Sequence, residues 1–197
     1  MALGTRRTLA LAIAALGTTA AVIVTEVARV RRHGQAEHLP EALAETVEVA
    51  VAGYRGGSTR ENALLNLLTA TSFTFALARL STFTIRRRGT LGPFRNLVLR
   101  DRHVHHFVPG ILLAFLAGGA SIVKRDETVD PLLAVPFGVG VGLTLDESAL
   151  LLHLDDVYWS EEGIVSVQIT AIALLMLSGL ALGLRVLRRG EAEVLPG

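Results

Sequence analysis

The residues best suited to chemistry are histidines and acids at the ends of two hydrophobic segments. Three of the six histidines fall within four positions, directly before an apolar segment that starts at Phe107. The next apolar segment carries Asp146 and Glu147 and ends beside His153. Ionisable groups at membrane depth are costly and usually face a partner or a cavity. These two segments are therefore where we expect a functional site.

Imidazole and carboxylate groups together suit zinc, iron and similar metal ions. We therefore expect a site for a divalent ion of the zinc or iron type between the two segments. Such an ion would lower the pKa of a bound water molecule, and Glu147 is the candidate general base or outer-shell group. The reaction class would be metal-assisted hydrolysis of a lipid-type substrate. The expected metal ligands are His103, His105, His106, Asp146 and His153.

The spacing of the acids limits how they act together. Asp146 lies two helical turns before His153, about 10.5 Å along a helix axis. These two side chains therefore need another helix to help them hold one ion. Glu147 points about 100° away from Asp146 and needs a different partner.

Two arrangements of the histidine cluster stay open. In the first, the helix of the third apolar segment extends back to Asp101, and His103 then shares a face with His106. In the second, that helix starts near Pro109, and His103 pairs with His105 in an extended arm. Either arrangement brings two imidazoles within reach of one ion.

Two rival hypotheses use these charges without a metal. Arg79, inside the second apolar segment, is expected at the same depth as Asp146, so that it can pair with Asp146 or Glu147. In a proton-coupled transporter, Arg79, Asp146, Glu147 and His153 would form a relay. In a non-catalytic membrane scaffold the ion pair would be structural, and removing one partner of such a buried pair costs about 3–5 kcal/mol.

Composition indicates the elements that position these residues. The chain has 197 residues, of which 51% are hydrophobic, and residues 164–184 form 21 uncharged positions in a row. That is long enough to cross a hydrocarbon core of about 30 Å. We predict an all-α integral membrane bundle, one domain over residues 1–197, in the cell membrane. Its five transmembrane helices are expected near residues 8–25, 62–85, 107–123, 131–154 and 164–184.

The first span has an alternative interpretation as a cleaved secretory signal, because Arg6 and Arg7 precede it. No small-x-small cleavage site followed by mature-like sequence appears before Glu26, so we expect a retained helix. Basic residues are nearly balanced across the membrane, with eight on the N-terminal side and ten on the other. The positive-inside rule therefore leaves the orientation open.

Residues 40–53 show a different periodicity. Apolar side chains recur every three or four positions on one side, and glutamates occupy the other. This predicts an amphipathic helix from Pro40 to Gly53. Its acidic face argues against contact with anionic lipid, so we expect it to pack on the bundle at the membrane interface. The following Ser58-Thr59-Arg60-Glu61 is typical of a capping box.

The third and fourth spans are joined by a short turn and should pack antiparallel, with their histidine ends together. Small residues at four-residue spacing let membrane helices approach closely. They are Gly110, Ala114 and Gly118 on one span and Gly138 and Gly142 on the other. The face of Gly142 continues to Asp146. We therefore expect the packing face and the ionisable face of the fourth span to coincide.

Partners are constrained only broadly. The spans require membrane lipid, and a net charge of +1 gives no support for binding nucleic acid. Gly179 and Gly183 form another small-residue face, which would suit a homo-oligomer. The chain has no cysteine, which excludes thiolate metal sites and disulfides. Residues 190–197 are expected to fray.

The order of motifs carries one resemblance. Three motifs follow one another: His103-x-His105-His106 with Pro109-Gly110, then Leu145-Asp146-Glu147, then Asp156-Val157-Tyr158-Trp159. Together they resemble a pattern in a group of small multi-pass membrane proteins of high-GC bacteria to which no activity is assigned. The similarity covers residues 100–166, about a third of the chain, and implies a bacterial multi-pass membrane protein. The pattern departs from the repeated histidine boxes of membrane desaturases and from the H-E-x-x-H motif of metalloproteases.

Overall fold

A computed structural model gives the arrangement of the chain. It describes residues 3–34, 36–88, 98–99, 102–103, 106–124, 126–146 and 161–195. Six helices form over these residues: α1 (Leu3–His33), α2 (Leu39–Arg55), α3 (Thr59–Arg88), α4 (Phe107–Lys124), α5 (Asp130–Asp146) and α7 (Glu161–Val194). Two short strands, β1 (Val98–Leu99) and β2 (Arg102–His103), pair antiparallel.

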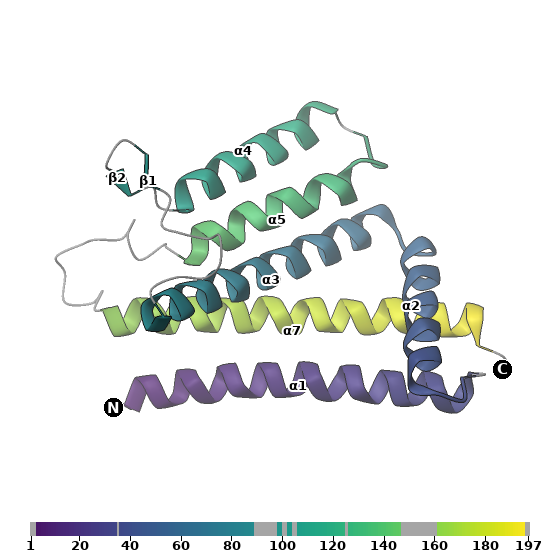
Figure 1. Ribbon diagram of the computed structural model, residues 1–197. Coiled ribbons are helices and arrows are strands. Elements are labelled where there is room, and N and C mark those ends of the chain that lie inside the picture. Colours follow the sequence, from purple (N-terminus) through teal and green to yellow (C-terminus); the bar gives the residue numbers. More distant parts are fainter. Residues whose placement is uncertain are drawn as a thin grey trace.

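Helices α1, α3, α4, α5 and α7 run alongside one another, and α2 crosses α1 and α7 at one end (Figure 1). Four helices within the described residues are long and apolar enough to cross a membrane: Ala10–His33, Thr59–Ser81, Phe107–Lys124 and Val167–Val194. Only 11–17% of the residues in these windows are buried within the chain, so most of their apolar side chains face outward. The protein is therefore an all-helical membrane bundle. The fifth predicted span, 131–154, is described only as far as Asp146.

Alternating glycines place α5 between two neighbours. A Cβ atom on Gly138 would lie 2.7 Å from the Leu67 carbonyl oxygen of α3. A Cβ atom on Gly142 would lie 2.7 Å from the Thr71 carbonyl oxygen of the same helix. A Cβ atom on Gly140 would instead meet the Gly110 carbonyl oxygen of α4 at 2.5 Å. The prediction that the Gly138 and Gly142 face packs on the third span was therefore wrong. That face packs on α3, and Gly140 packs against α4.

Contacts at both ends show that α4 and α5 are antiparallel, as predicted. Gly110 at the start of α4 lies against Leu143 near the end of α5. At the opposite end, the Ser121 hydroxyl donates a hydrogen bond to the carboxylate of Asp130 at 2.7 Å. Helix α4 begins at Phe107, and the backbone of His103 is extended in β2. Of the two arrangements left open, the helix that reaches back to Asp101 is therefore excluded.

The amphipathic helix was predicted correctly, and it packs on the bundle. Helix α2 crosses α7 where Gly53 faces Gly190, and a side chain on either glycine would overlap the partner's backbone. Val49 is fully buried at this crossing. Residues 190–197 were expected to fray, but α7 continues through Gly190 to Val194, so the prediction was wrong for that stretch; residues 196–197 lie outside the described part of the chain.

Helix α1 also runs past its predicted end at residue 25. Glu26, whose charge closed the apolar segment in the sequence, is 4% exposed. Its carboxylate accepts a hydrogen bond from Arg188 of α7 at 2.6 Å. Arg188 also binds Glu191, which Arg29 reaches at 3.3 Å. Two acids and two arginines thus neutralise one another, and the helix continues to His33.

Candidate functional site

One polar cluster joins four helices at the end of the bundle opposite α2. It consists of Arg79 on α3, His106 just before α4, Asp146 at the end of α5 and Gln168 on α7, and is called the Asp146 cluster below. Its centre is the Asp146 carboxylate, which is 4% exposed. Arg79 and His106 are more open, with 42% and 33% of their side chains exposed. A buried acid therefore lies between two groups that reach the surface.

The two oxygens of Asp146 have different partners. Arg79 Nε contacts Oδ1 at 2.5 Å in an ion pair, and His106 Nε2 lies 3.0 Å from Oδ2. Because the paired carboxylate is an acceptor, the hydrogen on that bond belongs to Nε2 of the imidazole. A further proton on Nδ1 would make His106 cationic without breaking the contact.

Arg79 and Gln168 also bind the backbone in the last described turn of α5. Arg79 Nη2 donates to the Asp146 carbonyl at 3.0 Å and to the Gln168 side-chain oxygen at 2.6 Å. Gln168 Nε2 donates to the Leu145 carbonyl at 2.8 Å. The cluster therefore ties α3 and α7 to the backbone of α5 as well as holding a buried charge.

Helical spacing explains why Arg79 and Asp146 meet. Thr71, Phe75 and Arg79 follow one another every four residues on α3, as do Gly142 and Asp146 on α5. Thr71 and Phe75 border the Cβ position of Gly142, so the two faces run in the same direction and in register. One turn further on, this register brings the guanidinium to the carboxylate. The guanidinium also lies 5.4 Å from the ring centre of Phe75.

The structure brings together two of the five predicted metal ligands, His106 and Asp146. The backbone of His103 lies in β2, while His105, His153 and the candidate base Glu147 fall outside the described residues. Within the described ranges, no group of three histidines and acids is placed to hold a metal ion. The metal site therefore stays a prediction. The predicted partnership of Arg79 with Asp146 is present.

Gln168 was missed by sequence analysis. It is 5% exposed and stands in the uncharged run of residues 164–184, which was interpreted only as lipid-crossing length. Its signal was available, since an amide inside a long apolar segment needs a hydrogen-bonding partner. The charged network of Glu26 and Arg188 was missed too, because these residues lie 162 positions apart.

Comparisons of the chain with protein-family models, curated proteins and solved structures found no match. The resemblance to membrane proteins of high-GC bacteria accordingly stays a prediction.

Proposed function

We propose that the protein is a five-span protein of the cell membrane that binds and passes protons at the Asp146 cluster, as part of proton-coupled transport. The observation that carries this proposal is the sharing of one buried carboxylate between Arg79, a permanent cation, and His106, whose side-chain type changes charge near neutral pH. Intramembrane ionisable residues in such contacts are typical of proton pathways.

The position of α5 supports a fifth span. It is packed along its length between α3 and α4, both of which have the length and apolarity of spans. Its first residue, Asp130, is tied to Ser121 near the end of α4, and its last, Asp146, to His106 at the start of α4. Helix α5, with 17 residues, is thus about as long as the candidate span α4, with 18.

The contacts of the cluster support a proton step at Asp146. His106 is the titratable member whose side chain reaches the surface, so it takes up a proton at Nδ1 while Nε2 stays on the carboxylate. Passing the Nε2 proton to Oδ2 leaves Asp146 neutral and His106 neutral again. Arg79 then keeps two acceptors, the Asp146 carbonyl and Gln168. The guanidinium is never left without partners during this step.

Proton flux into liposomes tests the proposal. Purified full-length protein is reconstituted with a trapped pH-sensitive dye, and a potassium diffusion potential drives proton entry. We expect faster acidification than in protein-free vesicles, and a return to their rate in His106→Gln and Asp146→Asn. Glu48→Gln, which removes an exposed acid of α2, is the matched control and should keep the wild-type rate. Wild-type flux equal to that of empty vesicles would overturn the proposal.

A second candidate is a purely structural role for the cluster. It is favoured by the bonds of Arg79, which join α3 to both α5 and α7. In that case proton flux is absent, while the free energy of unfolding shows strong coupling between Arg79 and Asp146. Stoichiometric zinc or iron in the wild-type protein, lost in His106→Ala and Asp146→Ala, would contradict both candidates and support the metal hypothesis instead.

A further inference from the structure

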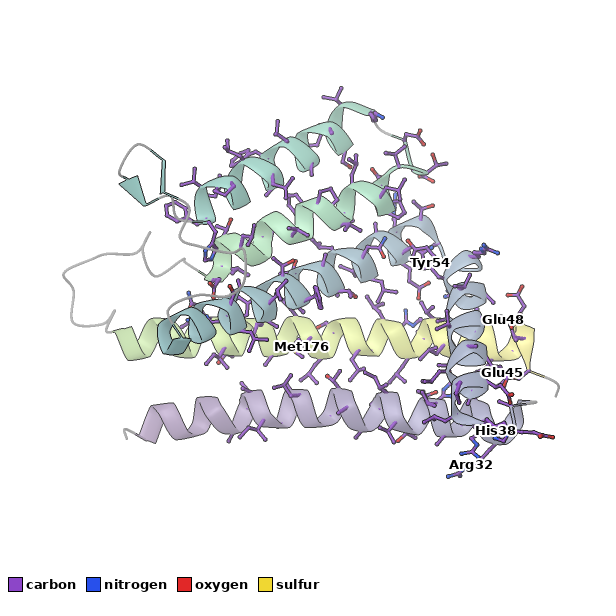
Figure 2. All side chains as sticks on the ribbon, viewed as in Figure 1. Arg32, His38, Glu45, Glu48, Tyr54 and Met176 are labelled. Atoms are coloured by element: carbon purple, nitrogen blue, oxygen red, sulfur yellow. The ribbon has the colours of Figure 1, made fainter. Side chains whose placement is uncertain are left out.

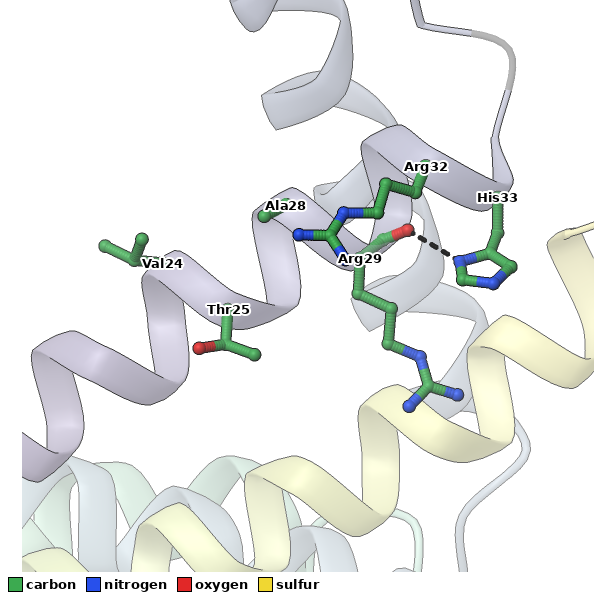
Figure 3. A pocket seen from close by; sticks show the side chains of 6 residues that line it. All are labelled: Val24, Thr25, Ala28, Arg29, Arg32 and His33. Carbon is green, nitrogen blue, oxygen red and sulfur yellow. Dashed lines mark hydrogen bonds between the residues drawn. The ribbon is translucent and has the colours of Figure 1, made fainter.

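The end of α1 beside α2 carries a hollow of about 630 Å³ (Figure 3). It lies at the opposite end of the bundle from the Asp146 cluster. The residues that line it are Val24, Thr25, Ala28, Arg29, Arg32 and His33. They change in character along the helix, with apolar side chains first and cationic or titratable ones last. From Val24 to Arg32 the helix rises about 12 Å.

Most charges beside the hollow are paired with one another, and the Glu45 carboxylate of α2 lies against Gly34 just beyond it. Arg29 and Arg188 balance Glu26 and Glu191. Arg32 is exposed and forms no hydrogen bond or ion pair with any residue that the structure describes. Its side chain lines the hollow and extends back along α1 toward Ala28, whereas that of Arg29 extends toward α7 (Figure 3). The hollow is therefore suited to an anion.

Helix α2 indicates where the membrane surface lies at this end. Three glutamates, Glu41, Glu45 and Glu48, follow one side of α2. Glu48 is exposed and points away from the middle of the bundle (Figure 2), whereas the Glu45 carboxylate lies against Gly34 at the end of α1. A second side carries exposed apolar residues at four-residue spacing: Leu39, Leu43, Val47 and Val51. An amphipathic helix of this kind lies in the plane of the interface with its apolar side in lipid. Because α2 crosses α1 near its end (Figure 1), Arg32 and His33 are at headgroup level and Val24 is deeper.

We propose that this hollow binds the phosphate headgroup of an anionic bilayer phospholipid. Arg29 and Arg32 contact the phosphate, and the upper part of an acyl chain lies along Val24 and Ala28. The sequence of apolar and cationic groups along α1 matches the order of acyl chain and phosphate in such a lipid. The proposal rests on the membrane placement of α1 and does not depend on proton transfer at the Asp146 cluster.

Native mass spectrometry of the full chain in detergent tests this site, with dioleoyl phosphatidylglycerol and dioleoyl phosphatidylcholine as probes. We expect tighter binding of phosphatidylglycerol by the wild type. Arg32→Gln should weaken that binding about fivefold, the usual contribution of one surface arginine to anionic-lipid attraction. Phosphatidylcholine binding should not change. Arg32→Lys, which keeps the charge, should recover most of the affinity.

Arg60→Gln is the matched control, because Arg60 is an exposed arginine of α3 at the same end of the bundle and outside the hollow. It should leave phosphatidylglycerol binding unchanged. Equal affinity for the two lipids, or equal effects of Arg32→Gln and Arg60→Gln, would overturn the proposal. So would displacement of phosphatidylglycerol by millimolar inorganic phosphate, since the hollow would then be a site for soluble anions. Loss of proton flux in the liposome experiment would leave these results unaffected.

Discussion

Arg79 and Asp146 form an ion pair across two parallel helices, although 67 residues separate them in the chain. The pair is asymmetric, because the carboxylate is almost fully buried and the guanidinium is partly exposed. Loss of the arginine leaves a buried negative charge, whereas loss of the acid leaves a cation with two other acceptors. Several consequences of this asymmetry can be measured.

Arg79→Gln should lower the free energy of unfolding by about 3 kcal/mol, the low end of the range for a broken buried pair. Asp146→Asn should lower it less, because Arg79 keeps Gln168 and the backbone carbonyl. The double variant should be more stable than the sum of the single effects predicts. Denaturation of the purified protein in mixed detergent measures all three. Additive effects would contradict a direct interaction.

Acid should partly restore the Arg79→Gln variant. Without the guanidinium, His106 is the side chain left on the Asp146 carboxylate among the residues that the structure describes. Imidazoles become charged as pH falls through about 6.5. The thermal midpoint of Arg79→Gln should therefore rise relative to wild type between pH 8 and pH 5.5. The double variant Arg79→Gln/His106→Gln should show no such recovery. Equal pH dependence in both variants would exclude His106 as the source.

Gly140→Ala should separate α5 from α4. The added methyl would lie 2.5 Å from the Gly110 carbonyl oxygen and 2.6 Å from the Ala114 nitrogen, and overpacking of this kind costs about 1–3 kcal/mol. Gly119→Ala is the control on α4, since no described atom lies within 4 Å of its added methyl. We expect lower thermal stability for the first variant and unchanged or higher stability for the second. Similar melting temperatures would show that the helices are not in close contact.

The turn between α4 and α5 should loosen in acid. The Thr128 hydroxyl and backbone N–H donate hydrogen bonds of 2.7 and 2.9 Å to the Asp126 carboxylate, and these hold the pKa of Asp126 below its usual value of 3.8. A lowered folded-state pKa means that the stabilisation is present above 3.8 and lost as pH falls through the folded value. Hydrogen exchange at the Thr128 amide should therefore be protected at pH 6 relative to Asp126→Asn. The difference should disappear at the lowest accessible pH.

Much of this arrangement follows from local patterns. Long uncharged segments predict the helices that cross the membrane, because the backbone in lipid must satisfy its own hydrogen bonds. A short turn makes α4 and α5 antiparallel, and counting residues from the span ends places Arg79 at the depth of Asp146. The amphipathic helix α2 follows from its periodicity. Each of these features depends on residues that are close in sequence, or on the thickness of a bilayer.

The choice of neighbours depended on packing between distant segments. Helix α5 carries glycines at positions 138, 140 and 142, so small-residue spacing alone could not tell which glycine meets which helix. The tertiary structure directs Gly138 and Gly142 to α3, and thereby brings Asp146 to Arg79. Likewise, Glu26 ends an apolar segment in the sequence, but Arg188 neutralises it and α1 continues. Charge compensation and close approach are properties of pairs of residues, so they appear only once the helices are assembled.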